Sequence, residues 1–404
     1  MEPYSVDSPG NPRRSLPLLD PTAPRRLPLL DLIADAQRQL EICNACRYCE
    51  GYCAVFPALE RRTAFTTGDV QFIANLCHDC RACYYACPFA PPHEFGVNLP
   101  EVLSAVRAET YQQYAAPAVL ARMARNAVRS VIALSLLGIL AVVSLIVAFS
   151  DPVRLFEQQL GPGSFYRVIP HLAMAIPALA ITVYGLTVFL VGGRRFWLDT
   201  GGSVRSTADV RAVGTALKEA FSLRYLKGGG DGCYYPKDQP SGARRILHSL
   251  IFYGFILAFV STTIAAIEQE VLGILPPYPL ISLPVITGSI GGVCMIVGCS
   301  GLMAMKLRSD QAPATRVMRS MDFAFLGVLN AASITGMLVL VFRDTAMLGL
   351  LITLHLGVLG GLYVTAPYSK FAHVVYRMAA LVQNRVEESH ERGDKLTRAA
   401  ENSN

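Results

Sequence analysis

Charged residues are scarce in this sequence. Asp, Glu, Lys and Arg make up 16% of its 404 residues, whereas a soluble domain usually carries about a quarter. This scarcity argues against an ordinary soluble enzyme. The formal net charge is only +6, a surplus too small to indicate a nucleic-acid-binding protein. Together with a hydrophobic share of 52%, these numbers predict a membrane protein.

Two recognisable motifs are also missing. No G-x-G-x-x-G opens a strand-to-helix turn, so we expect no dinucleotide or flavin site in this chain. Paired arginines at 13–14 and 25–26 suggest a twin-arginine export signal, but no apolar core region or cleavage site follows them. We therefore expect residues 1–30, which are rich in proline, to form a disordered segment that stays in the cytoplasm.

Six long segments carry no formal charge. Each reaches the roughly 20 residues that a helix needs to cross about 30 Å of hydrocarbon. A bilayer-spanning bundle is therefore expected, and lipid is a predicted partner. The expected transmembrane helices are 130–150, 168–193, 246–267, 281–305, 323–342 and 345–369.

The distribution of Lys and Arg predicts an orientation. The connection 194–245 holds ten of them, and others flank the remaining helices on the same side. The opposite loops hold only Arg154, Arg167 and Arg343. By the positive-inside rule, this asymmetry places both termini in the cytoplasm, in a multi-pass protein of the inner (cytoplasmic) membrane.

Eight of the eleven cysteines fall into two runs of the form C-x2-C-x2-C-x3-C. In two-cluster ferredoxins this run holds [4Fe–4S] clusters, and its fourth cysteine binds the other cluster. Zinc remains an alternative, although zinc ribbons use separated C-x2-C pairs, and disulfides are unfavourable in the cytoplasm. Arg47 and Arg81 follow the second cysteine of each run, where they either offset cluster charge or lie at the surface. The predicted ligands are Cys43, Cys46, Cys49 and Cys87 for one cluster, and Cys77, Cys80, Cys83 and Cys53 for the other.

The eight cysteines of the two runs fill the ligand positions of both predicted clusters, so no position is left for the other three cysteines. We expect Cys294 and Cys299 to be packing residues, and Cys233 has no assigned role. The predicted fold is mainly α: a ferredoxin-like helical domain with two [4Fe–4S] clusters, then a six-helix transmembrane bundle. The predicted divisions are the cysteine domain at 31–115, the membrane domain at 116–375 with a cytoplasmic loop at 194–245, and a cytoplasmic tail at 376–404.

Four histidines lie in or at the expected helices. A histidine in hydrocarbon is costly, so it usually has a partner or a cofactor. His355 and His373 are 18 residues apart, which is five whole turns of one continuous helix, so both face the same way. We predict a b haem between His248 and His373, and a second between His171 and His355. The alternative is that these histidines bond to backbone carbonyls or line a quinone pocket.

Several stretches resemble the tricarballylate/citrate-utilisation protein B family. They are Ile42–Ala58 (ICNACRYCEGYCAVFPA), Phe165–His171, Ile251–Phe255 and Tyr368–His373. The resemblance covers roughly residues 35–385. More distantly, the chain is similar to the cytochrome b (gamma) subunit of respiratory nitrate reductase and to heterodisulfide-reductase membrane subunits. In those, two histidines on the last helix bind haem, which implies this role for His355 and His373. The third helix here has only His248, a departure from relatives with two ligands on an early helix.

The resemblance implies an electron-transfer subunit of a flavoprotein:quinone oxidoreductase system. Its partner would be a flavoprotein dehydrogenase, protein A, that oxidises a tricarboxylate, and its acceptor a quinone. Alternatives are a heterodisulfide-reductase-like terminal reductase and a membrane redox sensor. A transporter is disfavoured because, apart from histidines, we expect no buried charge in the helices. We expect the cysteine domain and the basic loop, including an amphipathic face at 210–226, to dock the partner. Candidates for a polar group beside the quinone are Tyr253, Tyr368, Lys370, Arg244 and Arg245.

Overall fold

The computed structural model describes residues 29–203, 209–228, 230 and 232–401. The segment expected to be disordered, 1–30, lies outside these residues except for its last two. The described part is almost entirely helical, with one small antiparallel pair formed by β1 (Cys233–Tyr234) and β2 (Pro240–Ser241). The prediction of a mainly α fold is therefore confirmed.

Five helices build the domain that carries the cysteine runs. Side chains that share its apolar core include Leu40, Phe56, Phe72 and Leu103. Thr66 and Asp69 form a capping box at the start of the third helix, which fixes where the chain turns before the second cysteine run. The helices are α1 (Leu29–Cys46), α2 (Val55–Glu60), α3 (Thr67–Leu76), α4 (Ala82–Tyr85) and α5 (Leu99–Gln113).

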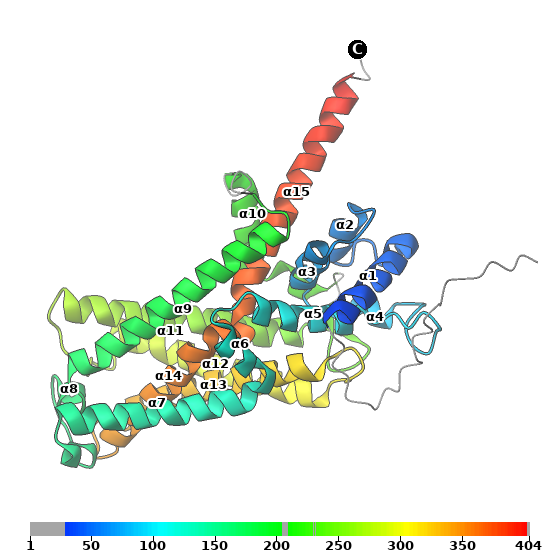
Figure 1. The fold of residues 1–404 in the computed structure, drawn as a ribbon. Helices are drawn as coiled ribbons and strands as arrows, with labels where there is room; N and C mark the ends of the chain where they lie inside the picture. Colours follow the sequence, from blue (N-terminus) through cyan, green and yellow to red (C-terminus); the bar gives the residue numbers. More distant parts are fainter. Residues whose placement is uncertain (1–28, 204–208, 229, 231, 402–404) are drawn as a thin grey trace, which may run out of the picture.

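Six helices are long and apolar enough to cross a membrane, which confirms the predicted bundle and indicates a membrane protein. They extend away from the cysteine domain (Figure 1). We call the end that contacts this domain the near end and the opposite one the far end. The six are α7 (Ala127–Phe149), α9 (His171–Asp199), α11 (Ala243–Glu270), α12 (Leu283–Arg308), α13 (Arg316–Val341) and α14 (Leu348–Thr365).

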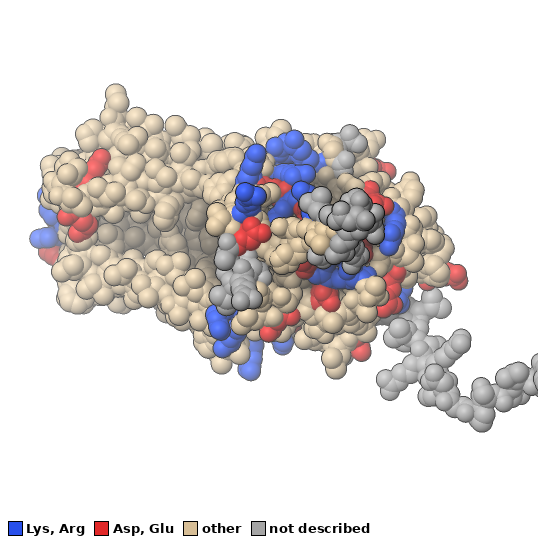
Figure 2. Space-filling view, turned by 90° about the horizontal axis from the view of Figure 1, so that it is seen from above, with Lys and Arg blue, Asp and Glu red and all other residues tan. Residues whose placement is uncertain are grey.

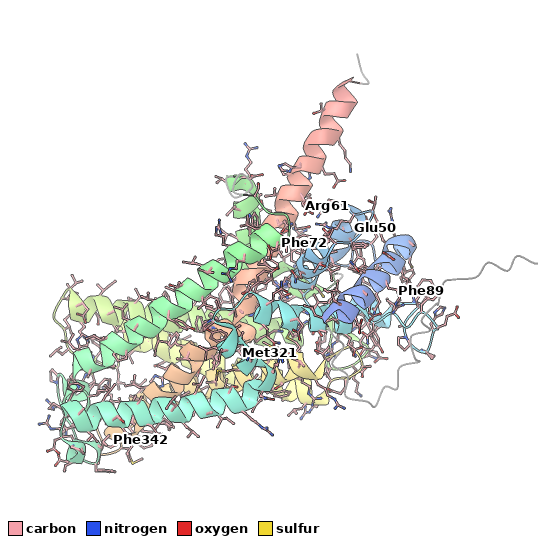
Figure 3. All side chains as sticks on the ribbon, in the orientation of Figure 1. Glu50, Arg61, Phe72, Phe89, Met321 and Phe342 are labelled. Carbon is pink, nitrogen blue, oxygen red and sulfur yellow. The ribbon has the colours of Figure 1, made fainter. Side chains whose placement is uncertain are left out.

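Charged side chains gather at the two ends of the molecule. Figure 2 shows an uncharged region along the bundle, with acidic and basic residues beyond it on both sides. Phe342 lies at the far end and Phe89 at the cysteine-domain end (Figure 3). An uncharged band between two charged ends is what a bilayer around the bundle requires.

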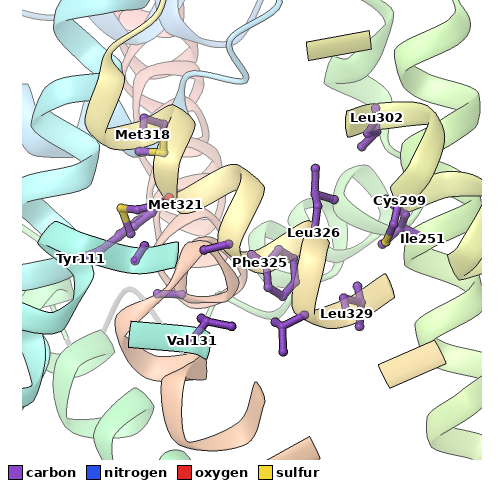
Figure 4. Packing of buried hydrophobic residues seen from close by; sticks show 14 of the residues in the cluster. Tyr111, Val131, Ile251, Cys299, Leu302, Met318, Met321, Phe325, Leu326 and Leu329 are labelled. Atoms are coloured by element: carbon purple, nitrogen blue, oxygen red, sulfur yellow. The ribbon is translucent and has the colours of Figure 1, made fainter. Parts of the chain in front are cut away.

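Helix α13 contributes eight buried residues to the core of the bundle. Figure 4 shows Met321, Phe325 and Leu329 of α13 in a cluster that also includes Tyr111 of α5 and Cys299 of α12. Glycines bring other helices into close contact: a Cβ added to Gly138 of α7 would lie 2.6 Å from the carbonyl oxygen of Gly357 on α14. Small residues at such positions let the backbones of membrane helices approach each other.

The sixth membrane helix ends before the predicted position. α14 stops at Thr365, and two short 3-10 turns, η5 (Ala366–Tyr368) and η6 (Lys370–Ala372), precede α15 (His373–Glu401). Pro367 explains the interruption because proline lacks the N–H that the helix ladder needs. The prediction that His355 and His373 share one continuous helix is therefore wrong, and the argument that they face the same way fails with it.

Helix α15 leads away from the bundle and connects the parts of the near end. It packs against α3, α9 and α10 (Val210–Phe221), the last of which belongs to the predicted basic loop. Glu219 of α10 is buried and forms ion pairs with Arg385 of α15 and Arg224. The amphipathic segment at 210–226 is thus docked on α15. Short elements complete the chain: α6 (Ala118–Ala121), η1 (Arg122–Asn126), η2 (Pro152–Leu155), α8 (Ser164–Val168) and η4 (Arg224–Lys227).

Candidate functional site

The first cysteine set combines three thiols of one run with the last thiol of the other. Its members Cys43, Cys46, Cys49 and Cys87 line a common cavity, together with Cys83 of the second set and apolar residues that include Phe89. Burial, and then the neighbouring thiols, raise the pKa of Cys43 to about 12. Cys46, at the end of α1, is exposed.

The second set lies deeper, toward the bundle. Burial raises the pKa of Cys53 and of Cys83 well above the usual thiol value, and the thiols of Cys77 and Cys80 add to the rise in both. The structure therefore places Cys53 with the second run, just as it places Cys87 with the first. This is the exchange of fourth cysteines that the predicted ligand assignment requires.

The residues of both sets are of the type that holds an iron–sulfur cluster, because each set consists of four cysteines. Within the described ranges, no three Cys, His, Asp or Glu side chains lie close enough together to hold one metal ion. In a [4Fe–4S] cluster each of four cysteine thiolates binds a different iron, so a set of four cysteines supplies the ligands that one such cluster requires. Metal binding would also offset the cost of holding buried thiols in the thiolate form.

Residues of the near end cover the second set. The N–H of Tyr234 in β1 donates to the carbonyl of Cys80 over 2.9 Å, so the small hairpin lies against the cysteine loop. The thiol of Cys233 is fully buried and donates to the carbonyl of Leu226 over 3.4 Å. Cys233 is thus a buried neighbour of Cys80 and packs within the hairpin that covers this set.

His248 and His373 meet at the near end, where α11 and α15 begin. Nδ1 of His248 is buried without a hydrogen-bond partner among the described residues, and Nδ1 of His373 lies 2.6 Å from the carbonyl oxygen of Lys370. Burial, with the charges of Arg377 and Lys370 and the adjacent His248, holds the pKa of His373 well below its usual value. Its imidazole is therefore neutral, which is the form that binds metals.

The structure gives His171 and His355 different partners. Nε2 of His171 lies 3.0 Å from a carboxylate oxygen of Glu270 on α11. Nδ1 of His355 lies 3.0 Å from the hydroxyl of Thr335 on α13. The contacts therefore link these histidines to other helices and do not join them to each other, so the second haem remains a sequence-based prediction.

A buried ionic group lies near His248 and His373. Asp322 of α13 is 2.7 Å from Nζ of Lys306 and 3.1 Å from Nζ of Lys370. The expectation that the helices hold no buried charge apart from histidines is therefore wrong. α13 begins at Arg316 and not at residue 323, so Asp322 lies inside the helix. The sequence does contain a signal for this ion pair: Asp322 directly precedes an apolar run, and Lys306 lies upstream of it.

The five residues proposed to lie beside a quinone do not form one site, and Lys370 is the one paired with Asp322. Arg245 and Tyr253 line a groove on the surface of α11 and α12, together with Cys294. Tyr368 donates to the carbonyl of Ala116 over 2.8 Å and also bonds to Tyr184. Arg244 turns away from the groove, toward the second cysteine set.

Comparisons with known proteins match both parts of the chain. Residues 36–119 match the family described as "Citrate utilization protein B Fer4-like domain", and residues 123–394 match "Citrate utilization protein B". The chain is similar to "Citrate utilization protein B" of Escherichia coli, with 38% identity over 355 residues, or 88% of this chain and 92% of the relative. No solved structure matches it. These matches span the cysteine domain and the helical bundle alike, and the chain therefore belongs to the citrate utilization protein B family.

Proposed function

We propose that the chain is a membrane electron-transfer protein. It accepts electrons from a flavoprotein dehydrogenase at the first cysteine set and transfers them through the second set to a b haem at His248 and His373. A quinone in the membrane is the final acceptor. The two iron–sulfur clusters supply one-electron redox chemistry, and the surrounding residues set its energy and direction.

The observation that carries this proposal is that the two helices bearing His248 and His373 contact the loop of the second cysteine set. Arg377, one turn after His373 on α15, donates to the carbonyl of Cys77 over 2.6 Å. Arg244, one turn before His248 on α11, donates to the carbonyl of Asp79 over 2.6 Å. Both histidine-bearing helices therefore touch the loop that presents the second set.

The outer side of the cysteine domain suits a protein partner. Cys46 is exposed, and the neighbouring Tyr48 has 63% of its surface accessible. An exposed ligand and an exposed aromatic ring beside the first set provide a place where a reduced flavoprotein can approach closely. The name of the Escherichia coli relative refers to citrate utilisation. We propose on this basis that the partner oxidises citrate or a related tricarboxylate such as tricarballylate.

The test is a direct measurement of cofactors and of electron flow. The full chain is purified without oxygen in lipid nanodiscs, and iron and acid-labile sulfide are counted against protein. Two clusters require about eight of each. EPR spectra are then recorded while a reduced flavoprotein donor and a soluble quinone analogue are added in turn. Reduction by the first and reoxidation by the second are expected.

Ligand variants give the matched control. Cys77→Ser removes a ligand of the second set and is expected to lower the iron content and block quinone reduction. Cys299→Ser alters a buried thiol in the bundle core and is expected to change neither. Zinc with negligible iron in oxygen-free protein contradicts the proposal. If the iron content is complete but the quinone analogue does not reoxidise the reduced clusters, the result favours a sensor or a terminal reductase.

A further inference from the structure

We propose that four arginines at the near end raise the reduction potential of the second cysteine set's cluster above that of the first. The second set is then the point from which electrons leave for the membrane. This inference deepens the proposed function and rests on it, because it assigns a direction to the two clusters. The four residues are Arg81, Arg107, Arg244 and Arg377.

Three of these arginines converge on one short loop from three different helices. Arg107 of α5 and Arg377 of α15 each donate to the carbonyl of Cys77 over 2.6 Å. Arg244 of α11 donates to the carbonyls of His78 and Asp79 over 2.9 and 2.6 Å. The guanidinium groups thus surround the backbone that carries two ligands of the second set.

Arg107 indicates that this shell is built to face negative charge. Its side chain is 2% exposed, and its Nε and Nη2 have no partner in the part of the chain that the structure describes. A buried guanidinium with unpaired N–H groups is costly unless an anion compensates it. Four thiolates with a cluster form such an anion, and its negative charge grows by one unit on reduction.

The charge of Asp322 also acts on Arg107, but Asp322 is itself paired with Lys306 and Lys370. Among the described residues, the acid paired with an arginine of this shell is Asp79. Its carboxylate lies 3.9 Å from Nε of Arg81 and accepts a hydrogen bond from Tyr235 over 2.7 Å. Arg81 and Arg244 also lie over the ring of Tyr235, with 4.0 and 4.8 Å from guanidinium carbon to ring centroid. One carboxylate does not neutralise four guanidinium groups, so the shell stays positive.

Arg47 provides a comparison within the same chain. Arg47 and Arg81 follow the second cysteine of their runs, and both have left-handed backbone angles, with φ of 54° and 64°. Arg47 is exposed, and its side chain donates to the nearby carbonyl of Asn44. Arg81 is 3% exposed and donates to the carbonyl of Asp310 over 2.9 Å. Water screens the charge of Arg47, whereas the charge of Arg81 acts through protein.

Two physical effects oppose each other at the second set. Burial disfavours the more highly charged reduced cluster and lowers its potential. Nearby positive charge favours that form and raises its potential. The arginines that touch this loop are held in low dielectric, where each unit of charge acts most strongly. We therefore expect the positive charge to dominate. The first set has one exposed ligand and an exposed arginine, and its potential is expected to be lower.

The test measures the midpoint potentials of both clusters in the full chain, by EPR-monitored redox titration in nanodiscs. Cys46→Ser, which alters an exposed ligand of the first set, identifies the signal of that set. In the unaltered protein the second set is expected to have the higher potential. Arg81→Gln is expected to shift it downward by at least 59 mV, which is a tenfold change in the one-electron equilibrium.

Matched variants separate charge from positioning. Arg47→Gln makes the same change in the same backbone conformation and is expected to leave both potentials in place. Arg107→Lys keeps the positive charge, so the midpoint potential of the second set's cluster is expected to stay close to that of the unaltered protein. Arg107→Gln removes the charge and is expected to lower that potential. If Arg107→Gln does not fold, two measurements still test the inference: the order of the two midpoint potentials in the unaltered protein, and the shift of the second set's potential in Arg81→Gln. Equal or reversed potentials, or an unshifted Arg81→Gln, overturn the inference. Absent iron would instead overturn the proposed function.

Discussion

At the scale of single residues, the buried charges described above each have at least one polar partner in the protein. Asp322 is held by two lysines, and the arginines of the near end bond to backbone carbonyls. Removing one partner of a buried ion pair leaves the other uncompensated, which typically costs several kcal/mol. Buried charges of this kind mark functional positions in membrane proteins.

The proposed haem gives a prediction at the same scale. His373→Ala is expected to remove the optical absorbance of the b haem at the near end, because the remaining His248 offers one axial ligand. The absorbance spectrum of the reduced protein measures it. His390→Ala alters an exposed histidine farther along α15 and serves as the control. His355→Ala tests the second haem. If it leaves all haem absorbance in place, the predicted pairing of His171 with His355 is wrong.

At the scale of elements, the membrane helices are held together by backbone contact at glycines. Gly357 of α14 meets the backbone of Ile139 on α7, and Gly254 of α11 meets that of Gly291 on α12. Apolar side chains alone do not drive helices together in lipid, which is equally apolar, so close packing must supply the attraction.

This contact predicts the effect of adding one methyl group. In Gly357→Ala the new Cβ would lie 2.6 Å from the backbone nitrogen of Ile139, so α7 and α14 must separate. We expect a loss of about 1–3 kcal/mol, the range typical of overpacking. Gly327→Ala in α13 places its methyl group in open space and is the control. Thermal unfolding in detergent measures both, and equal melting temperatures would contradict the packing argument.

The elements also show what the sequence reveals and what it leaves out. The cysteine spacing is a local pattern, so the grouping of Cys43, Cys46 and Cys49 follows from the residues between them. The apolar runs likewise predict the six helices. The arginine shell depends on Arg377 reaching Cys77 across 300 residues of chain, and no local pattern encodes that contact. The break between α14 and α15 was visible as Pro367, but an uncharged run concealed it.

At the scale of the whole molecule, α15 binds the cysteine domain to the bundle. Arg62 forms ion pairs with both Asp69 of α3 and Glu387 of α15, and Arg61 bonds to Asn384. Figure 3 shows Arg61 and Phe72 in the part of the cysteine domain beside α15. The cysteine domain therefore has a fixed position against the near end.

This arrangement gives a prediction of topology. The cysteine domain, α10 and α15 all belong to the near end, and the positive-inside rule predicts that they lie together in the cytoplasm. An epitope at the C-terminus is expected to be accessible in inside-out membrane vesicles and protected in right-side-out vesicles. An epitope inserted at Gly161, in the far-end connection, is the control and should behave oppositely. Accessibility of the C-terminus in right-side-out vesicles would reverse the orientation.

The first turn of α15 bears on the rate of the proposed electron transfer. His373 begins this helix and Arg377 follows it one turn later, already bonded to the carbonyl of Cys77. In the electron transfer proposed above, a route of covalent and hydrogen bonds connects the second cysteine set to the imidazole without a gap through solvent. We therefore expect this internal step to be fast. Turnover would then be limited by how often the two external partners collide with the protein.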